Sequence, residues 1–73
     1  MNYDNLINEE CMFIEYETPS SKGRMVMLAY YFDKKAKKIM RLLKNATLRV
    51  YQRRKFTYQD IDFVKKGSEL YGH

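Results

Sequence analysis

Apolar residues recur every three or four positions through the middle of the chain, and this spacing constrains the fold more than any other feature. They are Met25, Leu28, Ala29, Phe32, Ala36, Ile39, Met40 and Leu43. Such a series lies along one side of an α-helix, so it predicts one long amphipathic helix from about residue 21 to residue 45. The sequence TPSSKG at 18–23 is the strong break that precedes it.

Helices are also predicted on both flanks. Residues from about 3 to 16 place Tyr3, Leu6, Ile7, Cys11, Phe13 and Ile14 within one arc of a helical wheel. A last helix is expected to start after Thr57 as its N-cap, with Asp60 at the third position, and to run to about residue 71. Residues 46–55 are ambiguous, because they continue the helical arc but also alternate as a short strand would.

The predicted fold is therefore all-α, a small domain of three to four helices built around helix 21–45. Seventy-three residues are expected to form a single domain, 1–73. The alternative is an α+β fold with an N-terminal hairpin at 11–32, in which residues 11–18 pair with 24–32. Low β-branched content and the unbroken helical spacing favour the helical interpretation.

The charge is distributed unevenly along the chain. Residues 1–20 carry five acids and no base, whereas residues 34–55 carry ten lysines and arginines and no acid. These five acids cannot neutralise all ten bases within the chain. Such asymmetry, with a net charge of +5, indicates a polyanionic partner.

The basic run supplies the candidate binding residues. Cations four positions apart on a helix, such as Lys34 and Lys38, repel each other, and an external anion reduces this repulsion. Arginine and glutamine reach base edges, and tyrosine contacts phosphate or stacks. The candidates for binding nucleic acid or another partner are Lys34, Lys37, Lys38, Arg41, Lys44, Arg49, Tyr51, Gln52, Arg53, Arg54 and Lys55. The arginines at 49, 53 and 54 are expected to reach a ligand most readily.

These features predict a small basic DNA-binding or, more broadly, nucleic-acid-binding regulatory protein that acts by occupancy, with duplex DNA as the expected ligand. The alternative is a protein-binding modulator or inhibitor that docks an acidic partner through its basic and aromatic surface. A helix-turn-helix with helices at 34–44 and 47–55 is one arrangement, but the glycine often found in its turn is missing. A homodimer is left open, because the apolar residues before 33 surround their helix and need cover.

Enzyme chemistry has little support, and neither a metal nor another cofactor is expected. The single histidine is His73, and the single cysteine, Cys11, has no histidine near it in sequence to activate it. Cys11 is expected to be a buried thiol. The longest apolar run, MVMLAYYF, has eight residues, whereas a membrane span needs about 20. No signal peptide is recognised, so a cytoplasmic location is expected.

Overall fold

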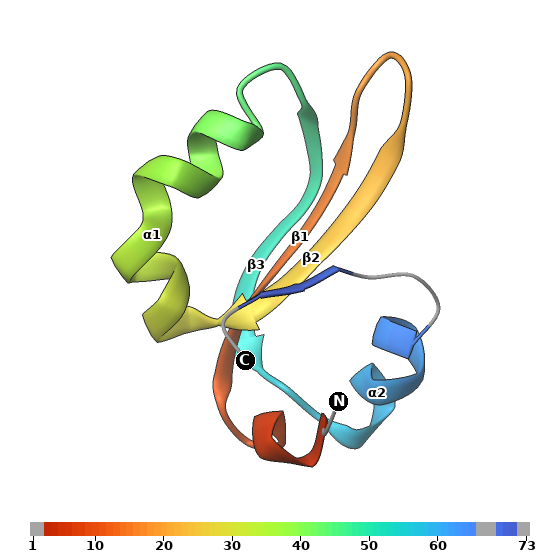
Figure 1. Cartoon of the computed structure of the whole chain (residues 1–73). Coiled ribbons are helices and arrows are strands. Elements are labelled where there is room, and N and C mark those ends of the chain that lie inside the picture. The colour runs from red at the N-terminus through yellow and green to blue at the C-terminus, as the bar shows by residue number, and fades with distance from the viewer. Residues whose placement is uncertain (1–2, 66–68, 72–73) are drawn as a thin grey trace.

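The computed structural model describes residues 3–65 and 69–71, which form an α+β domain (Figure 1). The elements are a 3₁₀ helix at Tyr3–Leu6, β1 at Glu10–Glu17, β2 at Lys22–Leu28, α1 at Ala29–Leu42, β3 at Thr47–Lys55, α2 at Tyr58–Lys65 and β4 at Glu69–Tyr71. The predicted all-α fold is therefore wrong, and so is the helical bundle that it implied.

The sheet is centred on β1, in the strand order β3-β1-β2-β4. β1 pairs antiparallel with β2 and with β3, and the short β4 pairs parallel with β2. β2 and β3 therefore run in the same direction on either side of β1. The register of β1 against β3 shifts between Glu15 and Tyr16, which leaves Arg49 as an extra residue in β3.

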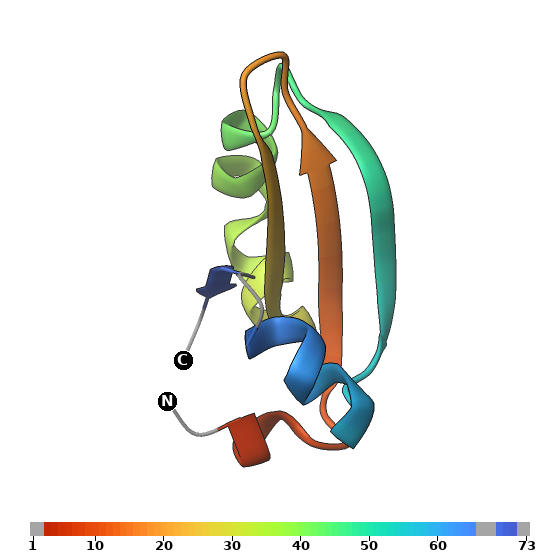
Figure 2. The same cartoon turned by 90° about the vertical axis from the view of Figure 1, so that its right-hand side faces the viewer.

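Helix α1 covers one face of the sheet and builds the larger core (Figure 1). Its buried residues are Met12, Ile14, Met25, Met27, Phe32, Ile39 and Leu43. The 3₁₀ helix and α2 lie at one end of the opposite face, where Leu6, Cys11, Phe13, Val26 and Phe56 form a second cluster. Figure 2 looks onto this face and shows that no described element covers its other end.

The predicted helix 21–45 is wrong in its first third, because residues 22–28 form β2 and α1 begins only at Ala29. Met25, Val26 and Met27 are all buried, since this strand has a core on each face. A strand buried on both faces shows no alternation of apolar and polar residues. The apolar spacing therefore passes from β2 into α1 without a visible break.

The predicted helix 3–16 is wrong for the same reason, since residues 10–17 form β1 and Cys11 to Ile14 are all buried. Asn8, with a φ of 67°, has a left-handed backbone between the 3₁₀ helix and β1. β1 and β2 pair as a hairpin, which is the arrangement of the alternative interpretation. Its turn is closed by Thr18, whose backbone N–H donates to Ser21 O over 2.7 Å.

The remaining predictions fail in part. Residues 47–55 form β3, so the second helix of a helix-turn-helix is a strand instead. The last predicted helix, expected to reach residue 71, is α2 at Tyr58–Lys65, and 69–71 form β4. None of the helices in the described ranges combines the length and the apolar character that crossing a membrane requires.

Candidate nucleic-acid interface

Helix α1 carries a stripe of cations on the side that faces away from the sheet. Ile39 is buried against the sheet, so the residues on the far side of the helix point outward. The α1 stripe consists of Lys34, Lys37, Lys38 and Arg41, at the spacing of one helical face, and Lys44 in the turn that follows; all five are exposed. At 1.5 Å per residue the stripe extends over about 15 Å.

The stripe is not neutralised from within the described part of the chain. No ion pair there involves its four residues or Lys44, and the acid nearest in sequence, Asp33, is paired with Arg53. Lys35, also exposed, interrupts the regular helix with φ −114° and ψ 19°. A shallow depression of about 490 Å³ opens over Asp33–Lys38 and Arg41. These cations are therefore available to an external anion.

The arginines of β3 are in the opposite situation, because each is paired with an acid of the same chain. Arg49 donates to Glu17 Oε1 from Nη2 over 2.6 Å and from Nε over 3.1 Å. Arg53 donates to both carboxylate oxygens of Asp33, over 2.9 and 3.0 Å, and to Glu10 Oε1 over 3.0 Å. The hydrogen bonds from these arginines hold the pKa values of Glu17 and Asp33 below their usual range.

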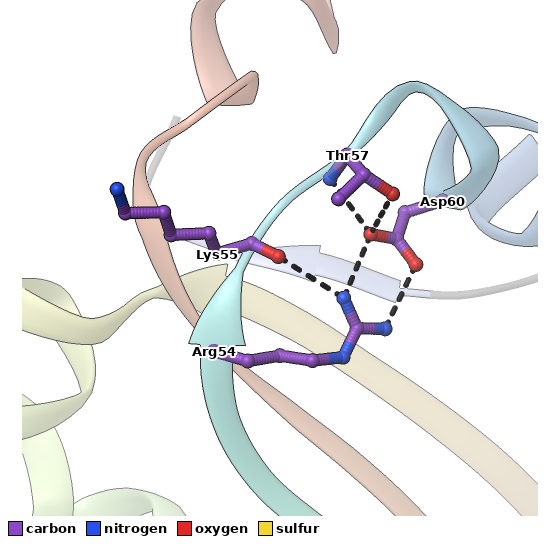
Figure 3. Close-up of polar contacts among 4 residues, drawn as sticks. All are labelled: Arg54, Lys55, Thr57 and Asp60. Carbon is purple, nitrogen blue, oxygen red and sulfur yellow. Dashed lines mark hydrogen bonds and ion pairs between the residues drawn. The ribbon is translucent and has the colours of Figure 1, made fainter.

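Arg54 connects the end of β3 to α2 through Asp60 (Figure 3), and its side chain stays partly exposed. Its guanidinium lies 3.9 Å from the centre of the Phe13 ring and forms a two-point ion pair with Asp60. Asp60 also accepts hydrogen bonds from the backbone N–H of Thr57 over 2.8 Å and from its hydroxyl over 3.0 Å. Thr57 therefore precedes α2 and contacts Asp60 at its third position, as the sequence predicted.

The other candidates on β3 are exposed and lie on alternate faces of the sheet. Tyr51 is 50% exposed and meets Phe32 of α1 edge to face, with ring centres 6.0 Å apart. Gln52 lies on the opposite face and lines a cavity of about 210 Å³ whose other walls include Phe13 and Val26. Lys55 is exposed at the end of the strand and has no ion pair among the described residues.

The structure thus divides the eleven candidates between two surfaces, the α1 stripe and the strand β3. Tyr30, which is not among the eleven candidates, is 67% exposed one turn before Lys34 on the same side of α1. The i, i+4 spacing from Tyr30 to Lys34 was the signal that could have found it. Val50, which is 36% exposed beside Tyr51, is not among the candidates either, because its apolar side chain continues the apolar side of the predicted helix.

No metal centre is present within 3–65 and 69–71, where no three His, Cys, Asp or Glu side chains are placed to hold an ion. Comparisons with protein-family models, with curated proteins and with solved structures found no match to this chain. The function is therefore argued from the geometry and charge of these two surfaces.

Proposed function

We propose that this protein binds the phosphate backbone of nucleic acid, with duplex DNA as its ligand, through the α1 stripe. The observation that carries the proposal is that these exposed cations have one sign and no acid of the described chain neutralises them. Each phosphate that they neutralise would release condensed counterions, which favours association. Such a protein would regulate by occupancy rather than by turnover.

The chemistry of the stripe favours contacts to phosphate over the reading of bases. Lysine supplies a flexible point charge, whereas arginine and glutamine supply the forked donors that recognise base edges. Arg49 and Arg53, which are suited to base recognition, are held by Glu17, Glu10 and Asp33. The proposal therefore includes weak sequence preference, because contacts to phosphate position a protein without specifying a sequence.

A salt titration of binding to a mixed-sequence DNA duplex tests the proposal. If Lys37 and Arg41 each contact a phosphate, the double variant Lys37→Gln/Arg41→Gln should lower the slope of log affinity against log salt by about 1.8. The matched control is Lys22→Gln/Lys55→Gln, which removes the same charge at the start of β2 and the end of β3. The control should leave the slope within about half a unit of the parent value, since only lost contacts change the count of released ions.

Two results would contradict the proposal. The first is a parent protein that fails to bind the duplex at about 50 mM salt, where contacts to phosphate are strong. The second is an equal change of slope in the stripe variant and in its control, which would mean that net charge rather than the stripe determines binding. Fluorescence anisotropy of a labelled duplex measures both variants under the same conditions.

A modulator that docks an acidic partner protein is the second candidate function. The observation that favours it lies on β3, where Val50 and Tyr51 add exposed apolar surface to a basic strand. A contact centred on these side chains would depend less steeply on salt than contacts to phosphate.

A further inference from the structure

The strand β3 lies at the edge of the sheet and leaves one side of its backbone open. It pairs with β1 alone, and Figure 2 shows no described element beyond it. Phe56 N donates to Glu9 O over 2.9 Å, which fixes the alternation of the antiparallel pair. Gln52 and Arg54 therefore direct their backbone groups toward β1, whereas Tyr51, Arg53 and Lys55 direct theirs outward.

This open edge is regular over residues 50–55. The bulge at Arg49 interrupts the register before Val50, and β3 ends at Lys55. Tyr51 and Arg53 offer one N–H and one C=O each, whereas Lys55 offers its N–H alone, because its carbonyl already accepts from Arg54 Nη1 over 3.1 Å (Figure 3). An added strand could therefore form about five main-chain hydrogen bonds. Val50 and Tyr51 supply exposed apolar surface beside these groups.

Charge decides what kind of strand fits the edge. Arg53 is paired with Asp33 and Glu10, and Arg54 is paired with Asp60, so Lys55 is the cation of this edge that has no ion pair among the described residues. A second copy of β3 would offer Lys55 no carboxylate, because β3 has no acidic residue. The complementary partner is a strand that carries carboxylates.

We propose that the outer edge of β3, residues 50–55, binds an acidic segment of another protein as an added strand. The segment lies extended along the edge and bonds to the backbone of Tyr51, Arg53 and Lys55. A carboxylate of the segment faces Lys55, and an apolar side chain packs against Tyr51. This inference concerns a different surface from the α1 stripe and does not depend on nucleic-acid binding.

Cations on an edge strand also have a purely protective role, since they prevent edge-to-edge aggregation. That role opposes a second copy of the chain but gives no reason for an acidic strand to form main-chain hydrogen bonds. Main-chain hydrogen bonds therefore distinguish the docking of an acidic strand from mere protection against aggregation.

The probe is a fluorescein-labelled ten-residue peptide of alternating glutamate and valine. One control peptide has the same sequence with its central six amides N-methylated, which removes donors but keeps every side chain. A second control carries lysine in place of glutamate. The acidic peptide should bind, and both controls should bind at least about ten times more weakly, because one lost main-chain bond alone accounts for up to about that factor.

Two substitutions at Lys55 separate charge from backbone on the protein itself. Lys55→Gln removes the charge and should weaken binding of the acidic peptide by about 2- to 5-fold, as expected for an exposed ion pair. Lys55→Pro also removes the outward N–H and should weaken binding of the peptide by a further factor of about 2 to 10. The ladder to β1 should survive, since the N–H of Lys55 points away from β1. Far-UV circular dichroism checks that survival.

Amide hydrogen exchange of the unmodified protein gives a readout that needs no substitution. The acidic peptide should slow exchange at Tyr51, Arg53 and Lys55 and leave Gln52 and Arg54 unchanged. Equal binding of the N-methylated peptide would overturn the proposal, because the contact would then rest on charge alone. Protection of these three amides without peptide, together with a doubled sedimentation mass, would overturn it in favour of a second copy.

The two surfaces can be tested separately. Lys37→Gln/Arg41→Gln, which should weaken duplex DNA binding, should leave the affinity for the acidic peptide within about 2-fold of the parent, since distant sites act independently. Failure of the peptide to bind while DNA binding persists would reject the inference about β3 alone. Failure of DNA binding while the peptide binds would reject only the proposed function.

Discussion

The guanidinium of Arg54 and the carboxylate of Asp60 form a two-point ion pair that ties the end of β3 to the first turn of α2 (Figure 3). The two bonds measure 2.9 Å from Nη1 to Oδ2 and 2.8 Å from Nη2 to Oδ1. Asp60 is 8% exposed. The hydrogen bond from Arg54, followed by those from Thr57, lowers the pKa of Asp60 to about 2.

This pair should make the fold sensitive to acid. The pKa of Asp60 is lower in the folded than in the unfolded chain, so its stabilisation is complete above about pH 4 and is lost as the pH falls toward 2. Solvent screens part of the effect at Arg54, so we expect a loss of about 1 to 2 kcal/mol in the free energy of unfolding. Urea unfolding at pH 5 and pH 2 measures it.

The matched variant for this measurement is Asp60→Asn, which keeps the shape of the side chain and does not titrate. It should be less stable than the parent at pH 5, and the difference should shrink by the same amount at pH 2. Glu17 and Asp33 titrate in both proteins and cancel. A parent and a variant that lose equal stability between pH 5 and pH 2 would contradict the assignment to Asp60.

Adjacent arginines should differ in their importance for stability. Arg54→Gln removes the pair with Asp60 and the contact over the Phe13 ring, and should cost about 2 kcal/mol. Arg53→Gln breaks pairs with Asp33 and Glu10, whose side chains are more than half exposed, and should cost less than about 1 kcal/mol. Denaturant unfolding of the two variants gives the comparison, and equal costs would rule it out.

Gly23 should be required because of the ring opposite it. Gly23 faces Tyr16 in the register of the β1–β2 hairpin, and a Cβ at this position would meet the Tyr16 ring. Gly23→Ala should therefore displace that ring from the core it packs against, at a cost of about 1 to 3 kcal/mol.

The control for this prediction is the double variant Tyr16→Ala/Gly23→Ala. Without the ring, the substitution at Gly23 should cost little, so the two changes should be coupled by about 0.5 kcal/mol or more. Thermal unfolding of the four proteins in the cycle measures this coupling. Additive costs would show that the Tyr16 ring is not what Gly23 accommodates.

Cys11 should be nearly inert in the folded protein. Its side chain is fully buried, and burial, together with the negative charges of Glu9 and Asp60, raises the pKa of the thiol to about 11. The thiolate is the reactive form, so a water-soluble alkylating agent should modify Cys11 slowly at neutral pH and rapidly in denaturant. Equal rates in the two conditions would contradict the burial that both the sequence and the structure indicate.

The sequence predicted the C-terminal part of the central helix but not the strand before it. Phe32, Ile39 and Leu43 are buried on one side of α1 and its following turn, as their spacing requires. Met25 and Leu28 fit the same spacing only because residues 25–27 of β2 are buried on both faces of the sheet and no polar residue lies between Met25 and Leu28. Tertiary burial, which no local pattern records, decided the structure of this segment.

The candidate surface was predictable to a similar extent. The outward position of Lys34, Lys37 and Arg41 follows from helical spacing alone. The pairing of Arg53 with Asp33 joins residues 20 positions apart and depends on where β3 lies relative to α1. Sequence reasoning counted this arginine as available, because the number of acids limits neutralisation but does not say which cations are neutralised.

The central position of β1 also determines the order in which the sheet can be completed during synthesis. The partner of β1 on one side, β2, follows it directly, whereas its partner on the other side, β3, is made only after α1, with Glu10 pairing with Lys55. Until that segment emerges from the ribosome, the nascent hairpin has an open edge along Met12, Phe13 and Ile14, where no cation lies. Chains cut short before β3 should therefore be prone to aggregation, since the arrival of the arginine-rich strand replaces an apolar edge with a charged one.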